Sequence, residues 1–150
     1  MKSTILDKSK LVNSVFSKVY KKYDLMNDIM SFGIHRLWKD KFIDWMNPYV
    51  GSKLIDVASG TGDIAKLFSK HNNNLSEITW IESNNEMFVE GKKNLRRLNN
   101  INWVKAPAEK LPIKDNAYDY YSISYGIRNV TDINKSLKEA YRVLKPGGRF

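Results

Sequence analysis

The sequence predicts an α/β fold, a doubly wound and mostly parallel sheet with helices on both faces. Short apolar runs alternate with segments of helical spacing from residue 53 onward. The first run, residues 53–58, ends in a glycine turn, and a helical pattern follows at once. Glu82 closes a second apolar run twenty residues after Gly62, where such folds place a carboxylate that binds a ribose. This alternation predicts parallel strands joined by right-handed crossovers.

The predicted elements follow one another with no internal repeat. Two helices are expected before the sheet, at residues 8–23 and 36–46. Four strands are then expected, at residues 53–58, 77–82, 101–105 and 118–125. The connecting helices are expected at residues 63–70, from Asn84 through Leu98, and at residues 133–144. The segment K-P-G-G at 145–148 is expected to stop the last helix, so a fifth strand would begin only at Arg149.

The sequence ends at the start of this fifth strand. We therefore expect the C-terminal strands of the sheet to be missing. The fourth strand, or a stub of the fifth, would then form an exposed apolar edge. We expect two parts: an N-terminal helical lid or cap that contacts substrate, residues 1–50, and a cofactor-binding domain, residues 51–150, that is incomplete at its C-terminus.

Both N-terminal helices are predicted to be amphipathic. Residues 8–23 carry an apolar stripe beside five lysines, so this helix either packs on the sheet, closes over the site, or rests on a membrane surface. The second helix carries a stripe of large apolar side chains: Leu37, Trp38, Phe42, Trp45 and Met46. Such a stripe is usually core, but methionine and aromatic side chains also suit an apolar pocket.

The loop after the first strand leaves two cofactor classes open. Residues 60–65 fit the pattern G-x-G-x-x-A of dinucleotide sites. Asp56 and Asp63 flank this loop, however, and their negative charge would repel a pyrophosphate. The pattern D-x-A-x-G-T-G-D resembles the first motif of S-adenosylmethionine-dependent methyltransferases, whose cofactor is a sulfonium cation. A glycine turn with a purely structural role is the third interpretation.

Composition excludes several classes of site. The 150 residues contain no cysteine, which excludes thiol chemistry, and the two histidines, His35 and His71, stand far apart, so we expect no metal site. We see neither a membrane span nor a secretory signal and expect a cytoplasmic protein. The net charge of +9 is spread along the chain without an aromatic and basic platform. We therefore expect no nucleic-acid partner, whereas contact with anionic lipid stays open.

Three stretches resemble one family closely. They are residues 23–31 with the following Gly33, His35 and Trp38, residues 124–130, and residues 142–148. All three are similar to signatures of the ubiquinone/menaquinone-biosynthesis C-methyltransferases, and the resemblance runs from about Val15 to Phe150. It implies a Rossmann-like enzyme that moves a methyl group from S-adenosylmethionine to a ring carbon of a polyprenylated quinol. The substrate would be 2-methoxy-6-polyprenyl-1,4-benzoquinol, demethylmenaquinol, or both. Three kinds of interaction are left open: peripheral contact with the inner face of the membrane, a homo-oligomer, and a quinone-biosynthesis complex.

The resemblance assigns cofactor contacts position by position. Thr61 stands where the family's glycine loop meets the cofactor, Glu82 where an acidic residue takes the ribose hydroxyls, and Ser124 at the cofactor-facing end of the fourth strand. Pro107 and Ala108 stand where the family has an Asn/Asp-Ala pair at the adenine. Proline offers no side-chain acceptor, so we expect weaker adenine recognition. The expected cofactor residues are Asp56, Gly60, Thr61, Gly62, Glu82, Pro107, Ala108 and Ser124.

Catalysis is expected to need an electron-rich ring, which forms when a quinol oxygen loses its proton. We expect Arg128 to hold that oxygen and stabilise its negative charge, with Asn129 orienting it. His35, Tyr23 and Asp24 are the candidates for moving the proton or closing the pocket. The prenyl tail is expected to contact Met26, Met30, Phe32 and Trp38.

Other functions stay open on the sequence alone. The positive charge keeps a methyltransferase of RNA or of a small phenol in consideration. Because the sheet is expected to be incomplete, a truncated, non-catalytic module that binds cofactor or a partner also stays open. The glycine pattern leaves a dehydrogenase open. Methyl transfer to bulk RNA, cofactor binding without turnover, and binding of NAD would respectively identify these alternatives.

Overall fold

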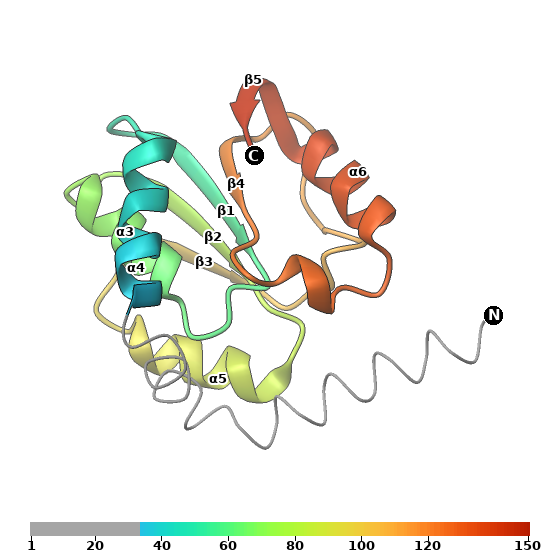
Figure 1. The fold of residues 1–150 in the computed structure, drawn as a ribbon, viewed down its shortest axis with the longest axis horizontal. Coiled ribbons are helices and arrows are strands. Elements are labelled where there is room, and N and C mark those ends of the chain that lie inside the picture. Colours follow the sequence, from blue (N-terminus) through green and yellow to red (C-terminus); the bar gives the residue numbers. More distant parts are fainter. Residues whose placement is uncertain (1–33) are drawn as a thin grey trace.

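The computed structural model describes residues 34–150, which form a five-stranded sheet with helices packed against it (Figure 1). The strands lie in the order β3-β2-β1-β4-β5, and each neighbouring pair is parallel. The strands are β1 (Lys53–Val57), β2 (Glu77–Ile81), β3 (Ile101–Val104), β4 (Tyr118–Ser122) and β5 (Leu144–Arg149). The helices are α3 (Ile34–Met46), α4 (Asp63–His71), α5 (Asn85–Asn94) and α6 (Ile133–Val143), with a 3-10 turn, η2, at Ile127–Asn129. The expected doubly wound α/β fold is confirmed.

Part of the predicted cap lies outside the described residues. The helix expected at residues 8–23 falls there, and so do Tyr23, Asp24, Met26, Met30 and Phe32. None of the helices within residues 34–150 is long and apolar enough to cross a bilayer.

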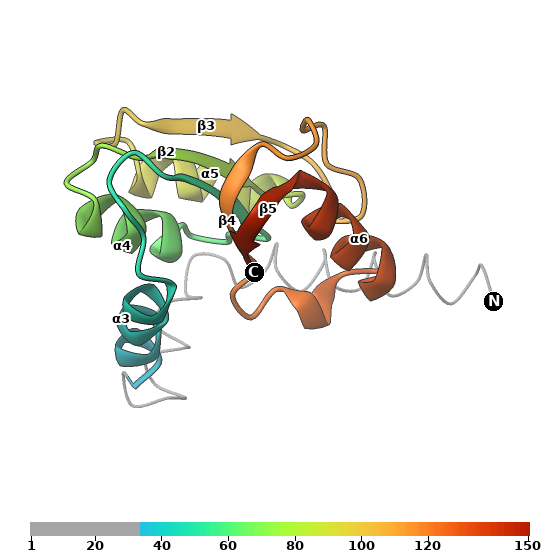
Figure 2. The same ribbon diagram turned by 90° about the horizontal axis from the view of Figure 1, so that it is seen from above.

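The sheet has an apolar core on each face because successive strand residues point to opposite sides. Leu54 of β1 and Trp80 of β2 belong to the core that α3, α4 and α5 cover. Figure 2 shows α4 and α5 on the same side of the sheet, with α3 beyond α4. The next residue along each strand, Ile55 in β1 and Ile81 in β2, packs instead in the core that contains Ala140 of α6. The central strand β1 is therefore buried on both faces, as an apolar run flanked by β2 and β4 predicts.

The C-terminal segment differs from the prediction. The K-P-G-G segment does not separate α6 from a later strand; β5 begins at Leu144, directly after the helix. The N–H of Ala117 donates to the carbonyl of Val143, and Lys145 pairs with Asp119 of β4, so the chain is drawn onto β4 at once. Proline and glycine are tolerated there because β5 is an edge strand with an irregular register. The sheet edge in these residues is thus polar and glycine-rich, and the expected apolar edge is wrong.

Two elements end several residues earlier than expected. Strand β4 ends at Ser122 rather than at residue 125, because the chain turns and Tyr125 adopts a left-handed conformation with φ 58°. Helix α5 ends at Asn94 rather than at Leu98, and Leu95 caps it while its side chain packs beneath Gly62.

Helix α3 begins two residues earlier than predicted, and its apolar stripe is only partly core: Met46 is buried in the core and Phe42 packs against it. The buried residues are His35, Ile43 and Met46, whereas Leu37, Trp38 and Trp45 are exposed. Helix α3 shares a core with α4 through Ile43 and Met46, and an ion pair of 2.5 Å between Lys39 and Asp63 joins the two helices.

Candidate functional site

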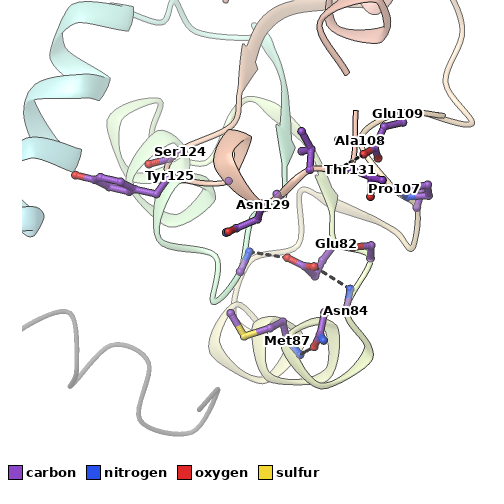
Figure 3. A pocket seen from close by; sticks show the side chains of 16 residues that line it. Glu82, Asn84, Met87, Pro107, Ala108, Glu109, Ser124, Tyr125, Asn129 and Thr131 are labelled. Atoms are coloured by element: carbon purple, nitrogen blue, oxygen red, sulfur yellow. Dashed lines mark hydrogen bonds between the residues drawn. The ribbon is translucent and has the colours of Figure 1, made fainter. Parts of the chain in front are cut away.

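A cleft of about 190 Å³ opens where the carboxyl ends of the parallel strands meet (Figure 3). Each of the first four strands contributes the loop that follows it. Ala58 and Gly60 come after β1, residues 82–84 after β2, residues 106–109 after β3, and residues 124–126 and 129–131 after β4. A doubly wound sheet binds its ligands at this edge, between loops that diverge to opposite faces.

Glu82 lies at the centre of this cleft, between the glycine loop and the start of α5 (Figure 3). One carboxylate oxygen accepts the N–H of Gly60 at 3.0 Å, and the other accepts the N–H of Asn84 at 2.9 Å. Burial raises the pKa of Glu82 above its usual value, and these N–H donors oppose that rise. A carboxylate fixed in this way retains free lone pairs, so it can accept hydrogen bonds from a pair of ribose hydroxyls.

The glycine loop and the loop after β4 meet at the floor of the cleft. Ala58 has a left-handed φ of 51°, and a Cβ added at Gly126 would lie 2.6 Å from the Cβ of Ala58. Gly60, with φ 57°, faces Met87 of α5, whose Cε would lie 3.3 Å from an added Cβ. The backbone at Gly60 and Gly126 thus comes close to the ligand space because no side chain intervenes.

Asp56 lies beneath the glycine loop and does not line the cleft. Its side chain is 1% exposed; Oδ1 accepts a hydrogen bond from the Ser122 hydroxyl at 2.5 Å, and Oδ2 has no partner among the described residues. Burial raises the pKa of Asp56 to about 7, against the opposing hydrogen bond from Ser122, and the charges of Glu82 and Asp63 add to the rise. A positive charge above this carboxyl would favour its ionised form.

The charges in the cleft indicate which cofactor fits. Glu82 and Glu109 line it, and none of the described lining side chains is a lysine or an arginine. A pyrophosphate bound here would have two carboxylates and no cation beside it, whereas a sulfonium would have favourable neighbours. The residues present therefore fit S-adenosylmethionine and do not fit a dinucleotide.

An apolar hollow adjoins the cleft. It is lined by aromatic side chains of α3, of the segment that follows β4, and of the residue after β5: Trp38, Phe42, Trp45, Tyr125 and Phe150. Ser124 and Tyr125 line both spaces, so the hollow and the cleft are neighbours just past the end of β4. The exposed aromatic stripe of α3 thus forms one wall of a pocket, which is the second of the two roles that its composition suggested.

The structure brings six of the expected site residues together in the cleft: Gly60, Glu82, Pro107, Ala108, Ser124 and Asn129. The other expected residues that the structure describes do not line this cleft. Arg128 is exposed and is not among the cleft-lining residues, although its neighbour Asn129 is. His35, Thr61 and Gly62 line a separate hollow between α3 and the start of α4. Within residues 34–150, no group of three or more metal-ligating side chains gathers in one place.

Sequence reasoning assigned no role in the site to Met87, Glu109 or Tyr125. Met87 stands in the first turn of the helix after Glu82, which is a position that faces the carboxyl edge of the sheet. Glu109 follows Pro107 by two residues, and its partners belong to a segment more than twenty residues later, so no local pattern reveals it. Tyr125 precedes a glycine at the end of a strand, which was the available signal for a turn.

The chain matches known proteins along almost its whole length. The model of the ubiE/COQ5 methyltransferase family matches residues 3–150. A ubiquinone/menaquinone biosynthesis C-methyltransferase of Rickettsia bellii is 57% identical over 150 residues, covering 96% of this chain and 60% of the relative. The corresponding protein of Rickettsia akari is 55% identical, covering 95% and 60%. The chain therefore spans about 60% of the length of these curated relatives.

Solved structures share the fold. A SAM-dependent methyltransferase of Thermotoga maritima superposes with a TM-score of 0.68 at 25% identity, covering 90% of this chain and 57% of that one. A SAM-dependent methyltransferase of Aquifex aeolicus gives a TM-score of 0.66 at 24% identity, covering 72% and 58%.

Proposed function

Because this chain belongs to the ubiE/COQ5 methyltransferase family, we propose that it transfers a methyl group from S-adenosylmethionine to a ring carbon of a polyprenylated quinol, either a benzoquinol or demethylmenaquinol, in ubiquinone or menaquinone biosynthesis. One observation carries the proposal: a cleft lined by carboxylates, with no lysine or arginine among its described lining residues, shares Ser124 and Tyr125 with an aromatic hollow. The first space suits a cationic cofactor, and the second suits an apolar acceptor.

The residues of the cleft have distinct roles in this proposal. Glu82 accepts the ribose hydroxyls, and the backbone of Gly60 lies against the cofactor. The base lies against Pro107 and Ala108, which offer apolar contact and a backbone N–H but no side-chain acceptor. Asp56 acts from below, where its charge stabilises a cation without contact.

The bound cofactor supplies an electrophilic methyl group on a positively charged sulfur; its transfer forms a carbon–carbon bond, breaks a carbon–sulfur bond and releases S-adenosylhomocysteine and one ring proton. This chain's residues must then hold the quinol as its anion and keep water out. Asn129 lines the cleft and orients a quinol oxygen. Arg128 is adjacent and exposed, so it reaches that oxygen only from the mouth of the cleft. His35, together with Tyr23 and Asp24, remains the proposed set for moving the proton or closing the pocket.

The aromatic hollow suits the prenyl tail. Trp38, Phe42 and Tyr125 give it large apolar walls, and Trp45 on the same helix is 81% exposed. An acceptor that is dissolved in a membrane fits a cytoplasmic enzyme that touches the inner face of the bilayer, and tryptophan is suited to that interface. The proposal also includes association of this chain with copies of itself or with a larger biosynthetic complex.

Calorimetric titration of this chain with S-adenosylhomocysteine, and with NAD as the control, tests the cofactor. Binding of the first alone is expected. Methyl transfer to a quinol with a short prenyl tail, followed by mass spectrometry, then tests the reaction. Binding of NAD, or transfer to bulk RNA in place of the quinol, would refute the proposal in favour of a dehydrogenase or an RNA methyltransferase. Binding without turnover would favour a non-catalytic module.

A further inference from the structure

Glu109 joins two walls of the cleft that are separate in sequence. It stands on the loop after β3, next to Pro107 and Ala108. Its Oε1 accepts the N–H of Thr131 at 2.5 Å and the N–H of Asp132 at 3.1 Å. These donors precede α6, where exposed N–H groups and the helix dipole favour a carboxylate.

The rest of the loop after β3 is attached to the same helix. Glu139 of α6 accepts the N–H of Leu111 at 2.7 Å, and Arg142 donates to the carbonyls of Leu111 and Ile113. Residues 106–116 therefore follow α6 along its length, and Glu109 is the attachment nearest the cleft. Glu109 is also the attachment that reaches the segment carrying Asn129.

We propose that Glu109 is a positioning residue, which ties the wall that holds the nucleoside to the wall that carries Asn129. This proposal rests on the proposed function, since it assigns the nucleoside to that wall. With both walls held at a fixed separation, the base of the nucleoside packs between residues 106–108 and residue 130. Asn129 then stays in position to line the cleft. Without the tie, the entropy of two loops opposes ligand binding.

Two substitutions separate this role from a simple charge effect. Both hydrogen bonds end on one oxygen, so Glu109→Gln keeps an acceptor and loses only the charge. Glu109→Ala loses both the acceptor and the charge. We expect Glu109→Ala to weaken S-adenosylhomocysteine binding roughly tenfold and Glu109→Gln to stay within about threefold of the unchanged chain. Glu90→Ala, at a glutamate on α5 that bonds Lys93, is the matched control and is expected to change nothing.

Hydrogen exchange measured by mass spectrometry gives a readout that does not depend on ligand. In the free Glu109→Ala chain, residues 106–111 and 124–132 are expected to exchange faster together, while β1 and β2 are unchanged. Equal binding by the alanine variant, or faster exchange in only one of the two segments, would overturn the tie. Equal losses in the Gln and Ala variants would assign the effect to charge and also overturn it. If the unchanged chain binds no S-adenosylhomocysteine, the proposed function fails while the exchange experiment still decides the role of Glu109.

Discussion

The Ser122 hydroxyl of β4 donates to Oδ1 of Asp56 on β1, while Oδ2 of the same carboxyl has no hydrogen-bond partner among the described residues. The two residues are register partners in the central pair of strands. A carboxyl group that is half satisfied and almost fully buried favours its neutral form, and burial accordingly raises its pKa to about 7.

Asp56 is therefore expected to make the protein less stable as the pH rises. An unfolded aspartate loses its proton near pH 4, whereas the folded one keeps it until about pH 7. Between pH 4 and pH 7 the free energy of unfolding therefore falls as the pH rises. The full loss, reached above pH 7, is about 4 kcal/mol. Asp56→Asn removes the titration. In urea unfolding, the stability of the variant relative to the unchanged chain should rise steadily from pH 4 to pH 7.5; a difference that does not depend on pH would contradict the raised pKa.

Gly126→Ala should separate the loops at the floor of the cleft. The added methyl group would lie 2.6 Å from the Cβ of Ala58, so one loop must move. We expect a loss of about 1–3 kcal/mol in unfolding free energy and at least roughly tenfold weaker S-adenosylhomocysteine binding by calorimetry. Gly51→Ala is the control, because it meets no atom within 4 Å and costs only the strain of its φ of 84°. Unchanged binding by Gly126→Ala would mean that the loops tolerate separation.

Arg142 should be hard to replace, even by lysine. Its guanidinium makes two hydrogen bonds to Glu139 and also reaches the carbonyls of Leu111 and Ile113. Lysine keeps the charge but cannot span these acceptors from one planar group. Both Arg142→Ala and Arg142→Lys are expected to lose about 2–3 kcal/mol in urea unfolding, whereas the exposed Arg97→Ala should stay within about 0.5 kcal/mol. Full stability of the lysine variant would show that only the charge matters.

Trp38→Ala should discriminate between quinols with and without a tail. The tail is proposed to lie in the aromatic hollow, and the ring in the cleft. Removing one aromatic wall is expected to raise the Kd of a prenylated quinol by roughly three- to tenfold and to leave the Kd of the tail-free ring unchanged. Leu75→Ala, an exposed apolar residue beside β2, provides the control. Equal losses for both quinols would place the tail elsewhere.

The sequence predicted the order of strands and helices well because each strand is a short apolar run with a turn at its end. The position of Glu82 at the edge of β2 followed from the same spacing. The end of β4 and the start of β5 were not predictable locally, since Lys145 joins β4 through Asp119, a partner 26 residues earlier. Local helical periodicity also could not show which side of α3 packs on α4, so the exposure of Trp38 and Trp45 required the three-dimensional arrangement.

The site residues at strand ends were predictable from the sequence, but those placed by turns or by distant contacts were not. Residues next to strand ends, such as Gly60 and Ser124, were found because parallel strands bring their carboxyl ends together. Arg128 and Asn129 could not be told apart, because the η2 turn decides which of the two faces the cleft. Glu109 depends on a contact between segments that are far apart in sequence, for which one sequence carries no signal.

The place of β1 between β2 and β4 has a consequence for synthesis on the ribosome. Leu54 pairs with Ile78 of β2 on one edge of β1 and with Tyr120 of β4 on the other. The partner β2 is therefore synthesised soon after β1, whereas the partner β4 is synthesised much later. Until residues 118–122 emerge, an apolar strand has an unpaired edge. Translation speed between α5 and β4 should therefore decide how long that edge is available to chaperones or to neighbouring nascent chains.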